Sequence, residues 1–222
     1  MSSRAPALLA GYGVVCGLNV LGHVLEQPWL RWLTKPLLMP LLAGYLLAAS
    51  GRPLDRRSRL VLVALVWSWV GDLMLMGEGE TFLLAGLGGF LLAQLTYLAA
   101  FGPSVRSGPL GRQPALVAPY VIAWAGLLAV LGPRLDDLLL PVTVYGASLV
   151  AMAATATGVH RRTAVGAGLF VVSDALIALT RLTGQLPLRA SRAEPLVMST
   201  YTLGQALITS GVVAAARPAD PR

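Results

Sequence analysis

Eight long runs of apolar residues divide this 222-residue chain and leave little else for it to fold into. Each run holds the roughly 17–25 residues that an α-helix needs to cross the hydrocarbon core of a bilayer. In agreement, 56% of the residues are hydrophobic and 12% are charged, against about 25% charged in an average soluble domain. We therefore predict an all-α, polytopic membrane bundle that forms a single transmembrane domain over residues 1–222, with no soluble domain. The predicted spans lie near residues 6–25, 30–50, 59–76, 81–101, 114–131, 138–157, 164–181 and 195–215.

The small number of cysteines and histidines excludes several kinds of site. The single cysteine, Cys16, allows no disulfide within the chain, and with only His23 and His160 besides, no zinc site of the Cys/His type can form. A carboxylate-bound metal has no motif in the sequence, and we expect no metal and no cofactor. His23 is expected to lie near the outer interface of the first span, without a special role.

The net charge of +7 comes from arginines in short loops beside apolar runs, which is typical of membrane topology rather than of nucleic-acid binding. We expect no nucleic-acid partner. Eleven arginines lie on the side of the two termini and five on the other side, which predicts a cell-membrane protein with both termini in the cytoplasm. The eleven are Arg4, Arg52, Arg56, Arg57, Arg59, Arg106, Arg112, Arg161, Arg162, Arg217 and Arg222, and the five are Arg31, Arg134, Arg181, Arg189 and Arg192.

Two of the ten acidic residues fall inside predicted spans. Asp72 follows Gly71 in the third run and Asp174 follows Ser173 in the seventh, whereas the other eight lie between or beside the runs. A carboxylate at mid-bilayer costs roughly 2.5–3.5 kcal/mol on insertion scales, so it needs a partner, a proton or a water-filled cavity. Both spans run outward in the predicted topology, which gives the two aspartates similar depths in the outer half of the membrane. They are candidates for a functional site; a structural ion pair or a neutral buried acid is the alternative.

The chain has one lysine, Lys35, against sixteen arginines. Lys35 precedes Pro36 in the second run, a few residues inside the outer boundary of the predicted membrane. A compact ammonium group with three rotatable donors would serve here as a partner for an aspartate or as a clamp for a lipid phosphate. The alternative is a side chain that extends to the interface and has no other role.

Polar side chains at helical spacing mark one face of several other runs. Gln94 and Tyr97 lie in the fourth run, Tyr145 in the sixth, and Tyr201 and Gln205 in the eighth. Such stripes commonly make hydrogen bonds between membrane helices. Tyr145 and Tyr201 also lie within about two turns of the outer ends of their helices. We count all five as candidates for substrate binding.

An ordered set of motifs thus runs through the spans. It consists of Lys35-Pro36, Gly71-Asp72-Leu73-x-Leu75, Phe90-Leu91-x-x-Gln94-x-x-Tyr97, Ser173-Asp174 and Tyr201-x-x-x-Gln205. Over essentially the whole chain, this set resembles the YhhN-like family of membrane proteins, which includes the animal lysoplasmalogenases. One departure is Gln94, where members of the family often have a histidine, so we expect no acid or base at that position.

The resemblance implies hydrolysis of the vinyl ether bond of lysoplasmalogens, a reaction that gives a fatty aldehyde and a glycerophospho-alcohol. Hydration of an enol ether needs a proton for a vinylic carbon and a base that activates water, and pairs of carboxyl groups supply both in glycoside hydrolysis. Two carboxyl groups that lie close together in a low dielectric cannot both ionise. We expect Asp72, next to apolar Trp69 and Leu73, to be the proton donor. Asp174 is then the base, and Lys35 holds the lipid phosphate.

Two other functions fit parts of the same pattern. A small proton-coupled transporter of lipids or amphiphiles would also use intramembrane Asp and Lys, but no inverted repeat with paired broken helices is evident. An intramembrane aspartyl protease would need two aspartates as well, but Trp69-Val70-Gly71-Asp72 lacks the Gly-x-Gly-Asp pattern of that family. We therefore expect an enzyme that takes a lysophospholipid from the bilayer.

Overall fold

The computed structural model describes residues 4–51, 53–182 and 190–216, and every regular element within those ranges is a helix. The all-α prediction is therefore confirmed. Eight long helices make up most of the described residues, and each overlaps one predicted span. They are α1 (Arg4–Val24), α2 (Pro28–Ala49), α3 (Arg56–Met74), α4 (Glu80–Phe101), α6 (Ala118–Leu131), α7 (Leu139–Ala156), α8 (Arg161–Ile177) and α9 (Ala190–Ala215). The short α5 (Pro109–Arg112) lies between α4 and α6, and a π-helical turn, η5 (Ala178–Leu182), extends α8.

Local chemistry sets several helix boundaries. Pro28 occupies the first turn of α2, where its missing N–H has no intrahelical partner to lose. Asp55 caps α3, because its side chain accepts a hydrogen bond from the backbone N–H of Ser58 at 2.6 Å. Gly79 precedes α4 with φ = +98°, a conformation that favours glycine. These signals set the residues at which three of the helices begin.

Seven of the described helices are long and apolar enough to cross a membrane when their short flanking turns are included. The one long helix outside this set is α3, which carries three arginines in its first turns and Asp72 near its end. It nevertheless packs against α2, α4 and α9. The chain is therefore a multi-pass membrane protein, and its most polar long helix contacts three others inside the bundle.

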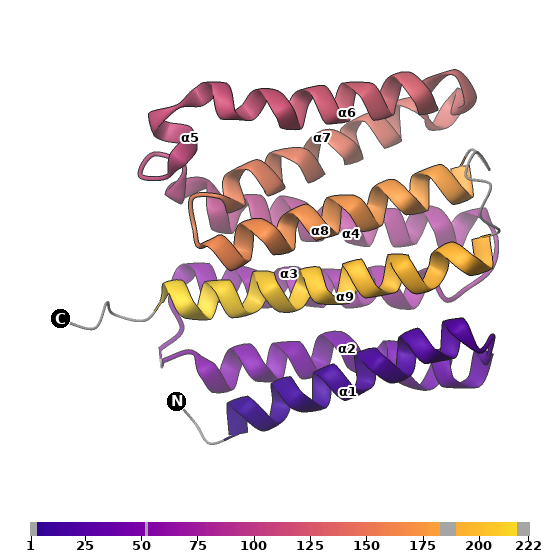
Figure 1. The fold of residues 1–222 in the computed structure, drawn as a ribbon, viewed down its shortest axis with the longest axis horizontal. Coiled ribbons are helices and arrows are strands. Elements are labelled where there is room, and N and C mark those ends of the chain that lie inside the picture. Colours follow the sequence, from indigo (N-terminus) through magenta and orange to yellow (C-terminus); the bar gives the residue numbers. More distant parts are fainter. Residues whose placement is uncertain (1–3, 52, 183–189, 217–222) are drawn as a thin grey trace.

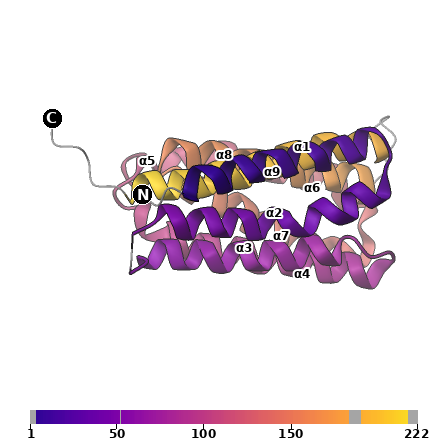
Figure 2. The same ribbon diagram turned by 90° about the horizontal axis from the view of Figure 1, so that it is seen from below.

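The helices run along a common axis in two layers (Figures 1 and 2). One layer contains α1, α9 and α8, and the other contains α2, α3 and α4; α7 contacts both α4 and α8. The pair α1 and α2 forms one edge of the bundle in Figure 1, and α6 forms the other edge, against α7. Most of α9 is buried inside the molecule, whereas Leu131 is the one fully buried residue of α6.

Glycines bring α3 against α4 and α8 against α9. A Cβ atom at Gly89 would lie 2.9 Å from the backbone nitrogen of Gly71, and one at Gly166 would lie 2.5 Å from the carbonyl oxygen of Gly204. Small residues at such points let the backbones of membrane helices touch. Because Gly71 precedes Asp72, the first of these contacts fixes the position of Asp72 in the bundle.

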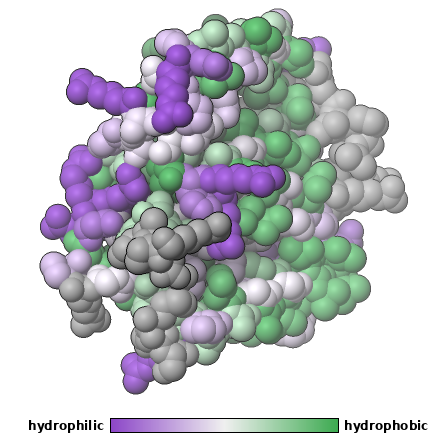
Figure 3. All heavy atoms as spheres, turned by 60° about the vertical axis from the view of Figure 1, so that its left-hand side comes forward, coloured by the Kyte–Doolittle hydropathy of each residue, from purple (hydrophilic) through white to green (hydrophobic). Residues whose placement is uncertain are grey.

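Hydrophilic residues gather at one end of the bundle, and hydrophobic residues cover the adjoining flank (Figure 3). This is the end at which α1 begins and α9 ends (Figure 1). The connections α2–α3, α4–α6 and α7–α8 reach the same end and carry exposed arginines such as Arg56, Arg106 and Arg161. The side of the membrane that this end faces stays a prediction. Arg52, Arg189, Arg217 and Arg222, which contribute to that prediction, lie outside the described residues.

Candidate active site

A cavity of about 60 Å³, here called the polar cavity, lies among the helices at the end away from the arginine-rich loops. Lys35 enters it from α2, Asp72 from α3, Asp174 from α8 and Tyr201 from α9. One water needs roughly 10–15 Å³ of such space, so the polar cavity has room for water beside its carboxyl groups. Four of the eight predicted site residues thus line one space, although their sequence positions span most of the chain.

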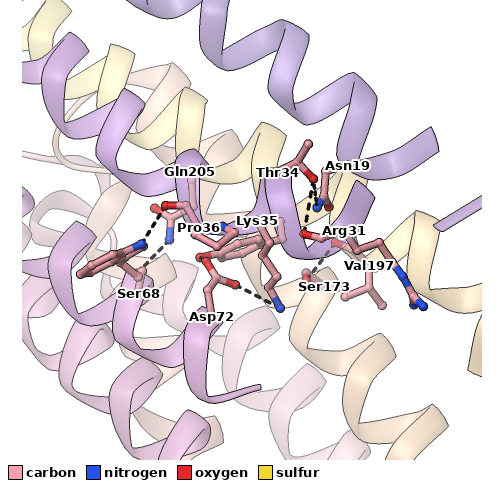
Figure 4. A network of polar contacts seen from close by, with 12 residues as sticks. Asn19, Arg31, Thr34, Lys35, Pro36, Ser68, Asp72, Ser173, Val197 and Gln205 are labelled. Atoms are coloured by element: carbon pink, nitrogen blue, oxygen red, sulfur yellow. Dashed lines mark hydrogen bonds and ion pairs between the residues drawn. The ribbon is translucent and has the colours of Figure 1, made fainter. Parts of the chain in front are cut away.

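Asp72 is almost completely buried, with 2% of its surface exposed, and it has two polar partners. The hydroxyl group of Tyr201 donates a hydrogen bond to Oδ2 at 2.7 Å, and the Nζ atom of Lys35 lies 3.5 Å from Oδ1. Figure 4 shows Lys35 and Asp72 pointing toward each other from α2 and α3. The ammonium group of Lys35 compensates the charge of a carboxylate that is removed from water. It is the partner that the sequence predicts Asp72 to need.

A hydrogen bond between α2 and α3 holds this ion pair in place. The indole Nε1 of Trp69 donates to the carbonyl oxygen of Pro36 at 2.9 Å (Figure 4). Pro36 is adjacent to Lys35, and Trp69 lies one helical turn before Asp72. The bond therefore fixes the two helices relative to each other at the level of their charged side chains.

Asp174 has a different set of partners. The hydroxyl group of Tyr145 donates to its Oδ2 at 2.5 Å, and Nε2 of Gln94 lies 3.5 Å from the same oxygen. Gln94 is fully buried, and its Oε1 accepts a short hydrogen bond from the hydroxyl group of Ser148. Asp174 is thus bound by neutral donors from α4 and α7, whereas Asp72 faces a cation.

Tyr97 and Gln205 form a third polar group in the interior. The Tyr97 hydroxyl donates to Oε1 of Gln205 at 2.6 Å, and Nε2 of Gln205 donates to the hydroxyl oxygen of Ser68 at 3.0 Å. Both residues are fully buried, and they and Gln94 lie outside the linings of the two described cavities. Their predicted contact with substrate stays a prediction. What the structure shows is a set of hydrogen bonds between α3, α4 and α9, one turn away from Asp72.

Two residues in the lining of the polar cavity were missed by the sequence reasoning. His23 was expected to have no special role, and Glu194 is one of the eight acids placed between or beside the apolar runs, yet both line the cavity. Nδ1 of His23 lies 2.9 Å from Oε2 of Glu194, and Nη1 of Arg31 donates to the same oxygen at 3.2 Å. The helical spacing of Asn19 and His23 is a signal for the histidine, because it gives both residues the same face of α1. No local signal pairs it with a residue 171 positions away.

A second and larger cavity, of about 630 Å³, lies between α4, α6, α7 and α8. We call it the apolar cavity, because nearly all of its lining is leucine, valine, alanine and other carbon-rich side chains. The ionisable groups in this lining, within the described part of the chain, are Tyr145 and Asp174. The two cavities share four lining residues, namely Leu75, Phe90, Asp174 and Ile177. Asp174 therefore stands where a small polar space meets a large apolar one.

The fold and the site define a helical membrane protein with a buried carboxylate site that adjoins an apolar cavity. Comparison with known proteins gives the family: the model of the YhhN family matches residues 30–212, and the chain belongs to this family. The family resemblance drawn from the sequence motifs is confirmed.

Relatives that carry the name lysoplasmalogenase include a mycobacterial protein and two human proteins. The protein from Mycobacterium tuberculosis (strain CDC 1551 / Oshkosh) is 36% identical over 93% of this chain and 85% of its own length. Human lysoplasmalogenase TMEM86B is 34% identical over 83% of this chain and 76% of its own length. Human lysoplasmalogenase TMEM86A is 31% identical over 99% of this chain and 94% of its own length. No solved structure matches the chain.

Proposed function

We propose that this protein is a lysoplasmalogenase, which takes a lysophospholipid from the bilayer and hydrolyses its vinyl ether bond to a fatty aldehyde and a glycerophospho-alcohol. The observation that carries the proposal is the convergence of Lys35, Asp72 and Asp174 on one buried cavity in a chain of this family. The names of the relatives support the same reaction. The enzyme would act in the cell membrane with both termini in the cytoplasm, without a cofactor and without a nucleic-acid partner.

The surroundings of the two aspartates favour one division of labour. A cation close to a carboxyl group stabilises its ionised form, and Lys35 is such a cation for Asp72. Asp174 borders the apolar cavity and has neutral donors, so the neutral acid is the form that this place favours. We therefore assign the proton donor to Asp174 and the base to Asp72. This is the reverse of the expectation from the sequence, which considered the apolar neighbours of Asp72 along the helix and left Lys35 as a possible partner of either aspartate.

The reaction then follows from four proton transfers, two in each direction. Asp174 donates its proton to the vinylic carbon on the chain side, which leaves an oxocarbenium ion at the carbon bonded to oxygen. A water in the polar cavity attacks that carbon and gives its proton to Asp72, which forms a hemiacetal. The hemiacetal hydroxyl returns a proton to Asp174, the carbon–oxygen bond breaks, and Asp72 protonates the departing glycerol oxygen. Both aspartates regain their starting states, and one water is consumed for each aldehyde formed.

The other predicted residues have supporting roles in this proposal. Lys35 holds the charge of Asp72 and lies on the side of the cavity where the phosphate would approach, so it serves both groups. Tyr145 and Tyr201 orient the carboxyl groups by the hydrogen bonds that they donate. Gln94, Tyr97 and Gln205 position the helices behind the site rather than touch the reacting bond.

The test is aldehyde release from a lysoplasmalogen by the purified protein in detergent or reconstituted vesicles. The substrate with a saturated ether in place of the vinyl ether is the chemical control, because it cannot be protonated to an oxocarbenium ion. Uptake of the intact lipid by sealed vesicles, without aldehyde, would instead support the proton-coupled transporter. The Asp174→Asn variant should lose aldehyde release while it keeps its place in the membrane.

A further inference from the structure

We propose that the apolar cavity binds the single hydrocarbon chain of the lysolipid and so places the vinylic carbon that takes the proton beside Asp174. The inference rests on the proposed function and adds to it the site for the chain, the orientation of the substrate and the residues that limit chain length. Three features of the cavity carry it: its lining, its junction with the polar cavity and its place in the bundle.

The lining has the chemistry of a hydrocarbon site. Leucines from α4 and α6 face valines and leucines from α7 across a volume of about 630 Å³. Ligand sites of this kind commonly measure about 300–1,000 Å³ and are mostly apolar, with a few polar groups that fix orientation. Here Tyr145 and Asp174 are those groups, and they are hydrogen-bonded to each other at 2.5 Å. A chain without polar atoms fits the remainder of the lining.

The junction between the cavities gives the orientation. Asp174 lines both spaces, whereas Lys35 and Asp72 line the polar cavity. A lysolipid changes from polar to apolar at its vinyl ether, so this bond belongs at the junction. The vinylic carbon that takes the proton is the one on the chain side of the bond, which is the side of Asp174. The carbon that water attacks is one atom nearer the headgroup, toward Asp72. With the chain in the apolar cavity and the vinyl ether at the junction, the lysolipid presents one vinylic carbon to Asp174 and the next to a water beside Asp72. The headgroup then lies on the side of Lys35.

The apolar cavity lies near the lipid-facing side of the bundle. Its lining on α7 extends from Leu140 to Val150, about 15 Å along the axis at 1.5 Å per residue. The wall toward the outside is α6, which has one fully buried residue, Leu131, and packs mainly on α7. On that wall, Trp124 lies against Gly146 of α7, where an added Cβ would come within 2.8 Å of its indole nitrogen. A lipid in the bilayer is therefore separated from the cavity by a single helix.

The cavity would select and align the chain rather than raise affinity. Lipid tails in the bilayer are as apolar as leucine, so moving a chain from the bilayer into the cavity brings little hydrophobic free energy. What the walls can do is hold the chain in one register, so that the vinylic carbon stops at Asp174. The consequence is that a side chain added to the wall should change chain-length preference more than it changes the chemistry.

Gly88 and Gly126 give a matched pair of variants. Both glycines have open space around the position of an added Cβ atom; Gly88 lines the apolar cavity on α4, whereas Gly126 is exposed on α6 outside the lining. Gly88→Leu should lower kcat/KM for a long-chain vinyl ether lysolipid relative to a short-chain one by roughly tenfold or more, the scale of steric discrimination in apolar pockets. Gly126→Leu should leave the ratio unchanged. An equal effect of Gly88→Leu on all chain lengths, or none, would overturn the proposal. If Gly88→Leu does not fold, Ala123→Leu on the facing wall makes the same test.

A binding measurement separates this inference from the proposed reaction. Lysolipid with bromine atoms on its chain should quench the fluorescence of Trp124, and the quenched component should be missing in Trp124→Phe. This result would support the chain site even if no vinyl ether is cleaved, in which case the proposed function fails alone. Quenching that is equally strong with a brominated two-chain phospholipid would show a site for bulk lipid and would overturn the assignment to the substrate chain.

Discussion

Replacing Lys35 by methionine tests whether the only lysine of the chain compensates the charge of Asp72. Methionine has a similar length and keeps the apolar contacts of the stem, so the variant removes little besides the ammonium group. The Lys35 and Asp72 side chains are 14% and 3% exposed, which leaves little water to replace the lost partner. The carboxylate must then stay buried without a counter-charge or take up a proton.

The structure gives the magnitude. Removing one partner of a buried ion pair typically costs about 3–5 kcal/mol, because the other charge is left uncompensated. The distance of 3.5 Å between Nζ and Oδ1 is longer than in the strongest charged hydrogen bonds, and Tyr201 still donates to Oδ2. Both facts favour a loss of stability at the lower end of this range, about 3 kcal/mol. The double variant Lys35→Met with Asp72→Asn should recover most of this loss, because the neutral amide needs no cation and can still accept the hydrogen bond from Tyr201.

The assay is reversible unfolding in mixed micelles, with aldehyde release measured on the same preparations. Lys35→Met should lower both stability and turnover, and the Michaelis constant should rise as well if the lysine also holds the phosphate. The double variant should be more stable than Lys35→Met and remain inactive. A single variant that loses less than about 1 kcal/mol, as for an exposed pair, would show that Lys35 does not serve Asp72. A higher Michaelis constant with unchanged turnover and stability would leave only the role in phosphate binding.

Three further predictions concern the chemistry, the packing and the topology. Asp72→Asn and Asp174→Asn should each lower turnover by at least the ~10²–10⁴-fold that positioned proton transfer supplies, and the double variant should cost little more than the worse single one; near-normal activity of an inserted Asp174→Asn protein would remove it from the mechanism. Gly166→Leu should destabilise the protein in a thermal melt, because an added Cβ meets the backbone of Gly204 at 2.5 Å, whereas Gly168→Leu, in open space on the same helix, should not; similar melting temperatures would refute the close α8–α9 contact. Reporter fusions after Gly79 and after Arg222 should report opposite sides of the membrane, and the same side for both would contradict the eight-span topology.

The helices themselves could be predicted from the sequence, because their cause is local. A backbone in lipid must satisfy its own hydrogen bonds, so each apolar run of sufficient length becomes a helix, and the polar or glycine-rich connections mark the ends. The predicted span near residues 81–101 and the helix α4 at Glu80–Phe101 differ by one residue at one end. The ranking of Asp72 and Asp174 among ten acids followed in the same way, from the cost of a charge within an apolar run.

The partners of these aspartates could not be predicted, because nothing local connects residues that lie on different helices. The sequence left both aspartates as possible partners of Lys35, and the packing of α2 on α3 gives the lysine to Asp72. His23 and Glu194 were set aside for their positions near helix ends, yet the meeting of α1, α2 and α9 brings them to the same cavity. The apolar cavity has no sequence signal at all, since a leucine that lines a space and one that fills the core look alike in the chain. The sequence by itself thus determined which segments enter the membrane and which charges need a partner, while the glycine contacts and helix crossings of the tertiary structure decided which partner each charge has and where space was left for a substrate.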